Sequence, residues 1–188
     1  MRVFTTILFC CFFIMLSAKP IVQGNVSFDL PGTHSFSAYG AELDYDSNFG
    51  VGVGVEVLSS TGNSLIGGGV ELQLPRGIDW DEEEYDEYDL DPTFNFMPIY
   101  LVGKYGFAPG ASMNPYLVGH IGFDMFFAND DYAGTADTSG GLYWAVGAEV
   151  ATASKLCISA LFRGCNGSVD ILDVSQTNLT LRLGYRFK

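Results

Sequence analysis

The stretch Phe49–Val57, FGVGVGVEV, alternates branched apolar residues with glycine and then places Glu56 where the next glycine would stand. Successive side chains of a β-strand point to opposite faces, so this period of two predicts a strand. One face carries the valines Val51, Val53, Val55 and Val57. The opposite face is nearly bare and ends in a charge. The stretch therefore predicts a strand with one apolar face and one small, polar face.

The same alternation recurs along the chain, whereas helical periodicity is almost absent after residue 18. Eight stretches are predicted to be strands: Ser35–Tyr45, Phe49–Leu58, Ser64–Leu74, Phe94–Phe107, Pro115–Phe127, Gly141–Thr152, Leu156–Gly164 and Thr177–Phe187. Most are close to the roughly 9–11 residues that a tilted transmembrane strand needs. Asn25–Leu30 also alternates, and it is either the true start of the first strand, with a bend at Pro31, or a separate piece.

The connections between these strands differ in length on the two sides. They are short after the second, fourth and sixth predicted strands, and long after the third, fifth and seventh, where they comprise Pro75–Thr93, Ala128–Gly140 and Cys165–Gln176. Only the first connection, Asp46–Asn48, breaks the trend. Short turns on one side and long loops on the other are typical of an outer-membrane barrel, whose short turns face the periplasm.

The polar face of these strands is also the face with small residues. The last strand, for example, sets Leu179, Leu181 and Leu183 against Asn178, Thr180 and Arg182. A soluble barrel needs a densely charged exterior, whereas an eight-stranded barrel has an interior only just wide enough for side chains. The pattern therefore favours an all-β, eight-stranded antiparallel up-and-down transmembrane β-barrel with its apolar face toward lipid. A soluble lipocalin-like ligand-binding barrel is the architectural alternative.

Parity along the strands assigns a set of charged side chains to the interior. The predicted interior charge network is Glu56, Lys104, Arg186, Glu149, Arg182, Glu71, Asp124 and Arg163, with Glu42 and His120 also facing inward. Unpaired charges are costly in a narrow lumen, so these residues are expected to form structural ion pairs. The alternative is a gated conduction path or a proton-linked site. His120 and Asp124, four residues apart on one strand, are expected to pair.

Aromatic residues gather at both ends of the predicted apolar faces. Tyr105, Phe107, Tyr185 and Phe187 fall at the periplasmic ends, and Tyr45, Phe49, Phe127 and Trp144 at the opposite ends. Two such bands are the girdles that membrane barrels place at the membrane–water interfaces.

The first segment, with Arg2, an apolar run over Val3–Leu16 and small residues before Lys19, is predicted to be a signal peptide over residues 1–18. Cleavage after Ala18 is the first choice and cleavage after Gly24 the second, with the barrel over residues 25–188. The net charge of −13 argues against a nucleic-acid partner. Cys157 and Cys165 are separated by about 26 Å if the chain between them is extended at ~3.3 Å per residue, so a disulfide would need a sharp bend and two free thiols are expected.

The longest predicted loop is strongly acidic. Its carboxylates are Asp79, Asp81, Glu82, Glu83, Glu84, Asp86, Glu87, Asp89 and Asp91. We expect a solvated outer loop, with weak divalent-cation binding or contact with a cationic partner as the alternative, although the run lacks the ligand spacing of an EF-hand. A Ser-His-acid triad would need a serine beside His120 at a barrel rim, and the sequence does not show one; the other histidine, His34, is followed by Ser35 near the amino terminus. No catalytic residue, cofactor or metal site is expected.

Four segments together resemble a known family. They are Phe96–Phe107 (FMPIYLVGKYGF), Pro115–Phe126 (PYLVGHIGFDMF), Gly141–Val150 (GLYWAVGAEV) and Leu179–Phe187 (LTLRLGYRF). The chain resembles the small eight-stranded outer-membrane β-barrel family, of the OmpA/OmpX-like outer membrane protein beta-barrel domain type.

This resemblance implies a monomer in the bacterial outer membrane, in contact with lipid. It also implies recognition by the barrel-assembly machinery through the C-terminal strand, where Phe187 provides the terminal aromatic but is followed by Lys188. The implied role is structural or surface interaction, in adhesion or envelope integrity, with a partner at the long loops. A narrow porin-like channel for small solutes or ions is the alternative.

Overall fold

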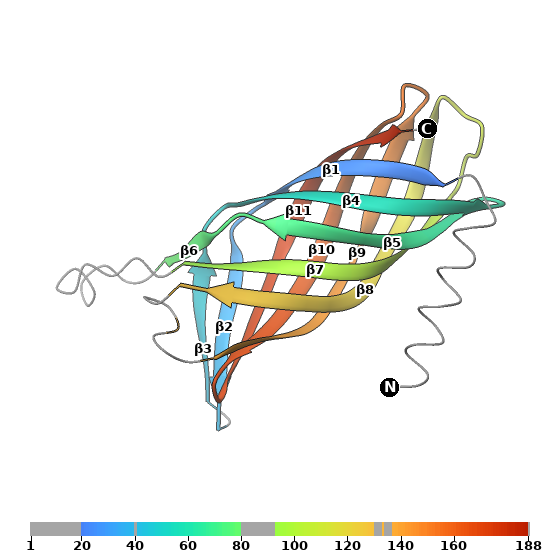
Figure 1. Ribbon diagram of the computed structural model, residues 1–188. Coiled ribbons are helices and arrows are strands. Elements are labelled where there is room, and N and C mark those ends of the chain that lie inside the picture. The colour runs from blue at the N-terminus through green and yellow to red at the C-terminus, as the bar shows by residue number, and fades with distance from the viewer. Residues whose placement is uncertain (1–19, 40, 80–92, 130–132, 134–136, 188) are drawn as a thin grey trace, which may run out of the picture.

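The structure, a computed structural model, describes residues 20–39, 41–79, 93–129, 133 and 137–187, which form one antiparallel sheet of eleven strands (Figure 1). The strands are β1 (Ile21–Asp29), β2 (Gly32–Ala38), β3 (Ala41–Ser47), β4 (Gly50–Thr61), β5 (Ser64–Gln73), β6 (Arg76–Asp79), β7 (Thr93–Gly106), β8 (Met113–Ala128), β9 (Thr138–Thr152), β10 (Leu156–Val169) and β11 (Leu172–Phe187). Within the described ranges there is no helix of the length and hydrophobicity needed to cross a membrane. The predicted signal peptide lies outside these residues.

Eight of the strands close into a barrel in the order β1-β4-β5-β7-β8-β9-β10-β11. Closure depends on β1, which pairs antiparallel with β4 along one edge and with β11 along the other. The residue pair Val26–Leu183 marks the seam between the first and last strands of the barrel. The predicted eight-stranded antiparallel barrel is confirmed.

The first strand of the barrel is β1. The prediction that the stretch Ser35–Tyr45 forms the first barrel strand was therefore wrong. That stretch contains a hairpin, because β2 pairs with β3 and the chain turns between Ala38 and Ala41, with Tyr39 at a positive φ of 51°. Alternation continues on both sides of the turn, so the two short strands look like one long strand in the sequence. Asn25–Leu30 does not continue through a bend at Pro31 into the next stretch: it belongs to a separate strand, β1, which runs over Ile21–Asp29 and is by itself the first strand of the barrel.

This reassignment removes the exception in the loop pattern. The segment between β1 and β4 now lies on the same side as the other long connections and contains the β2–β3 hairpin. The Cys165–Gln176 loop was also wrongly predicted: β10 extends to Val169, β11 starts at Leu172, and the turn is at Asp170–Ile171. Beside this extension β2 pairs with β11, so the two hairpins lie together beyond the barrel (Figure 1).

The two faces of the wall are divided as predicted. Large apolar side chains on the outside, such as Val53 and Ile66, are about half exposed at 50%, while Glu56 is fully buried. The bare face of β4 is required by the filled interior: a Cβ at Gly50 would lie 2.7 Å from the Arg76 guanidinium, and one at Gly52 would lie 2.5 Å from Ser27 Oγ. This polarity is the reverse of a soluble ligand-binding barrel, which it excludes.

Candidate functional site

The lumen contains an unbroken chain of ion pairs in which cations and anions alternate. In order from the periplasmic end it comprises Arg186, Glu149, Lys104, Glu56, Arg182, Glu71, Arg163, Asp29 and Arg76. Each carboxylate thus lies between two cations, and an arginine stands at each end. We call this set the ion-pair chain.

The periplasmic half of the ion-pair chain is centred on Lys104. Its Nζ lies 2.7 Å from Glu149 Oε2 and 2.8 Å from Glu56 Oε2. Arg186 Nη2 reaches Glu149 at 2.7 Å, and Gln23 joins the group by accepting from Lys104 and Arg186 and donating to Glu149. Four residues of the predicted interior network, Arg186, Glu149, Lys104 and Glu56, are thus linked one to the next in this half.

The outer half of the ion-pair chain connects Glu56 to the mouth of the barrel through two arginines. Arg182 donates to Glu56 at 3.0 Å and also to Glu71, and Arg163 donates to Glu71 at 2.6 Å. Glu71 also accepts a hydrogen bond from the Ser27 hydroxyl at 3.0 Å, and Glu56 accepts one from the Tyr100 hydroxyl at 3.2 Å. Buried charges need such partners, and here each carboxylate has several.

Two members of the ion-pair chain, Asp29 and Arg76, were missed by the sequence prediction. Asp29 accepts from Arg163 and Thr180 and lies 2.7 Å from Arg76 Nη2. The parity of Asn25–Leu30 could have found Asp29, had that stretch been assigned to the barrel. Arg76 follows Pro75 in a segment that the prediction gave to a loop, and nothing local in the sequence marks it.

Three residues predicted to face the lumen do not belong to the ion-pair chain. Glu42 is exposed, because it lies on β3 outside the barrel. His120 does not pair with Asp124; its ring stacks on Tyr100 at 4.5 Å, and its Nδ1 lies 3.2 Å from the Tyr143 hydroxyl. Asp124 is fully buried beside the Cys165 thiol, and no cation of the described residues pairs with it.

The predicted aromatic residues occupy two levels of the wall, with one exception. At the periplasmic end Tyr105 and Phe107 pack edge to face, as do Tyr185 and Phe187, with all four rings about half exposed. At the outer end the structure places Phe49 against Phe28, Trp144 against Phe162, and Phe127 on the outside of β8. The exception is Tyr45, which lies on β3 and packs against Phe36.

The other predicted features contribute little to a reactive site. The acidic run lies outside the described residues, except for the backbone of Asp79 at the end of β6. Across the residues that the structure covers, no three His, Cys, Asp or Glu side chains are grouped to hold a metal ion. Cys157 and Cys165 are both buried and form no disulfide.

His34 lies on β2, outside the eight barrel strands, and is fully buried with its ring 4.3 Å from that of Phe94. Burial, together with the nearby positive charge of Arg76, lowers the pKa of this histidine to about 3. His34 is therefore neutral at physiological pH.

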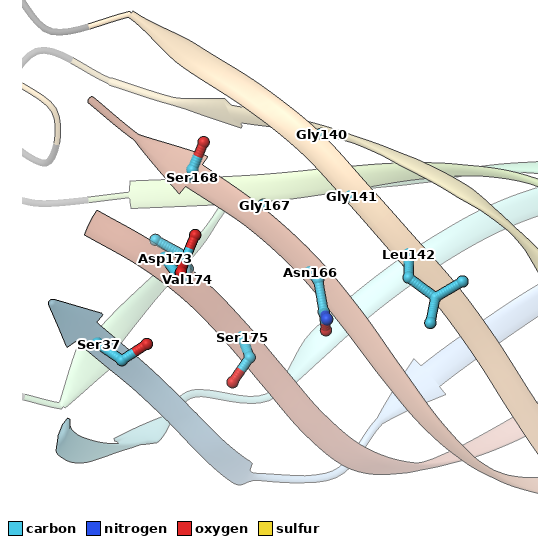
Figure 2. Close-up of a pocket in the computed structure, with 10 residues that line it drawn as sticks. All are labelled: Ser37, Gly140, Gly141, Leu142, Asn166, Gly167, Ser168, Asp173, Val174 and Ser175. Carbon is cyan, nitrogen blue, oxygen red and sulfur yellow. The ribbon is translucent and has the colours of Figure 1, made fainter. Parts of the chain in front are cut away.

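Two cavities lie at the outer end, where the strands extend beyond the barrel. The larger, of about 430 Å³, is bordered by β9, β10, β11 and β2 (Figure 2). A smaller one, of about 270 Å³, lies between the β2–β3 and β10–β11 hairpins. Ser37 and Asp173 line both, so the two cavities adjoin.

Comparisons with known proteins agree with this architecture. The chain matches the family described as outer membrane protein beta-barrel domain over residues 8–187. Among curated proteins no match is found.

Several solved structures are similar, each at 13% sequence identity. OprG from Pseudomonas aeruginosa has a TM-score of 0.55 over 89% of this chain and 95% of its own. AlkL, solved in lipid bilayers, has a TM-score of 0.54 over 91% and 92%, and neisserial surface protein A one of 0.50 over 89% and 97%. At this identity the likeness shows the fold alone. With its closed barrel, lipid-facing exterior and family match, the chain belongs to the outer membrane protein beta-barrel domain family and is a protein of the bacterial outer membrane.

Proposed function

We propose that the protein is a closed, non-conducting barrel that anchors a surface for interactions outside the cell. The single observation that carries this proposal is the ion-pair chain, which runs along the lumen without a break. Its members are almost entirely buried, from 0% exposure for Asp29 and Glu56 to 3% for Arg182 within the central part. An ion crossing the lumen would have to break several of these pairs and leave buried charges uncompensated, which is costly.

The two hairpins outside the barrel support an interaction role. They carry large side chains that face solvent, namely Tyr39 (94% exposed), Leu43 (60%) and Ile171 (60%). Leu43 lies on β3, Tyr39 in the turn before it, and Ile171 in the turn between the outer ends of β10 and β11. All three lie beyond the closed part of the barrel, so contact with membrane lipid does not explain them. Exposed apolar side chains that are grouped on a soluble surface commonly mark sites of interaction.

We also infer that the protein is not an enzyme. The His120 ring is buried against Tyr100 and Tyr143, so it is not available at a rim to act as a base. His34 is equally buried. Interaction with outer-membrane lipid, insertion by the barrel-assembly machinery through β11, and a monomeric state complete the proposal.

Conductance across planar lipid bilayers tests the closed lumen. We expect the purified full-length protein to give no single-channel steps in about 1 M salt, an ionic strength at which exposed charges are strongly screened. A matched variant, Glu71→Ala with Arg182→Ala, removes both members of a central pair and is expected to leak ions. Regular steps from the unchanged protein, scaling with salt concentration, would instead indicate the narrow porin-like channel.

A further inference from the structure

The larger outer cavity has a lining made for hydrogen bonding. Its polar side chains are Asn166 and Ser168 from β10, Asp173 and Ser175 from β11, and Ser37 from β2, with glycine backbone from β9 beside them (Figure 2). They supply three hydroxyls, one amide and one carboxylate, and no cation. The lining thus offers many donors and acceptors with little net charge.

These side chains lie on the outer surface of the wall. Cys165 and Gln176 are buried and face each other on the inside, so their neighbours Asn166 and Ser175, which are also register partners, point outward. Ser168 and Asp173 form the next outward pair, and Asp173 is in register with Ser37. On β9 the cavity begins at Leu142, just beyond Trp144 of the outer aromatic band. The cavity is therefore open to the headgroup layer of the membrane and to the medium.

Much of the hydrogen-bonding capacity of this lining is unused. Ser168 bonds to the Ser139 hydroxyl at 2.7 Å. The side chains of Asn166, Asp173 and Ser175 make no hydrogen bond to any part of the chain that the structure describes. Their backbone is held in strands β10 and β11, and Asn166 lies at the register shift between Cys165 and Gly167. β-Bulges often aim side chains at functional sites in this way.

We propose that this cavity binds a neutral saccharide. Sugar hydroxyls both donate and accept, which suits a lining of hydroxyls, an amide and a carboxylate, and the absence of a cation disfavours phosphate or sulfate. The volume of about 430 Å³ falls within the range of small-molecule sites. The adjoining smaller cavity ends at Tyr39, whose exposed ring offers a flat face for a sugar ring. The proposal deepens the interaction role above, on which it rests, by naming the ligand class.

The test uses the full-length protein in phospholipid nanodiscs and two sets of probes. One set is an array of neutral oligosaccharides, and the other is the neutral part of the core oligosaccharide of lipopolysaccharide, freed of its phosphates and acidic sugars. Binding of core oligosaccharide identifies the sugar of the surrounding membrane as the source, whereas binding to array glycans identifies a foreign glycan. Either result supports the proposal if substitutions in the lining of the cavity, called groove variants below, weaken the binding.

The groove variants are Asn166→Ala and Asp173→Asn, each expected to weaken binding about tenfold, because each removes polar contacts to the sugar. The matched controls, Asp170→Asn in the adjacent turn and Ser60→Ala at the periplasmic end, should leave the affinity unchanged. Absence of binding to both probe sets, or equal binding by groove and control variants, would overturn the proposal. The conductance experiment judges the closed lumen separately, so failure of one proposal is distinguishable from failure of the other.

Discussion

At the scale of single residues, Glu71 forms ion pairs that link opposite sides of the barrel wall. Its side chain comes from β5 and contacts Arg163 of β10 and Arg182 of β11, across the lumen. Only 1% of Glu71 is exposed, so bulk solvent screens these contacts little. Removing one charge from such a buried group costs more than the pair itself contributes, because the partners remain charged.

Replacement Glu71→Gln is therefore expected to destabilise the barrel by about 3–5 kcal/mol, since it leaves two buried arginines short of a carboxylate. The free energy of unfolding in urea, measured in phospholipid vesicles, checks this. Glu42→Gln, an exposed change on β3, is the control and should have no effect. Equal stability of the two variants would show that the ion-pair chain does not depend on this charge.

Gly69 shows at the same scale why the inner face is bare. A Cβ at this position would lie 2.7 Å from the ring of Tyr100, whereas one at Gly103 would have nothing within 4 Å. Gly69→Ala should displace Tyr100 from Glu56 and destabilise the protein by about 1–3 kcal/mol. Gly103→Ala should be neutral. The unfolding midpoint of each variant is the measurement, and a neutral Gly69→Ala would contradict the close packing.

At the scale of elements, the β2–β3 hairpin is the part that departs from a plain barrel. It is attached through β2 to the extension of β11 and through β3 to the end of β6. The His34 ring lies beneath it, in contact with Phe36 and Phe94. The packing of this neutral ring couples the hairpin to the barrel mouth.

The docking of this hairpin is expected to weaken in acid. The pKa of His34 is lowered from 6.5 to about 3 while the hairpin is packed on the barrel mouth. Protonation of His34 is therefore unfavourable when the hairpin is docked and favours the open state, in which the hairpin is released. Stability from His34 is complete above pH 6.5 and declines as pH falls toward 3. Amide hydrogen exchange over Thr33–Ser37, compared between pH 7 and pH 5 after correction for intrinsic rates, measures this.

His34→Phe serves as the control for the pH effect, because it keeps an aromatic ring without a titrating group. The extra opening at pH 5 should be absent in this variant. An NMR titration of His34 with a midpoint near pH 6.5 would contradict the prediction.

At the scale of the whole molecule, closure of the barrel decides its stability. Because β1 pairs on both edges, none of the eight barrel strands is left with an open edge along the seam. We expect the unheated protein to resist SDS and to migrate differently after boiling.

A proline in the seam tests this expectation. Val26→Pro removes a ladder donor from β1 and should abolish the folded band, or lower the temperature at which it disappears. Leu43→Pro, on β3 outside the barrel, should leave the folded band in place. A folded band of equal heat resistance in both variants would show that the seam does not hold the barrel closed.

The sequence by itself determined the side of the wall to which each strand residue points. Alternation is a local property, so the lipid-facing valines and the inward glycines with Glu56 follow from residues Phe49–Val57 alone. The predicted number of eight barrel strands is also correct, but the eight stretches counted included Ser35–Tyr45, which lies outside the barrel, in place of β1. Alternation does not show where a chain reverses, however, and the hairpin at Tyr39 was therefore taken for one strand.

Only the tertiary structure decided which strands become neighbours and which charges meet. Asp29 and Arg163 are 134 residues apart and come together because β1 closes against β11. Arg76 joins them because β6 continues along β7 beyond β5 with its register shifted by one residue, from Val70–Ile99 to Arg76–Phe94. Side-chain parity carries no information on register between distant strands, so the ion-pair chain and the outer cavity exist only once the barrel is closed.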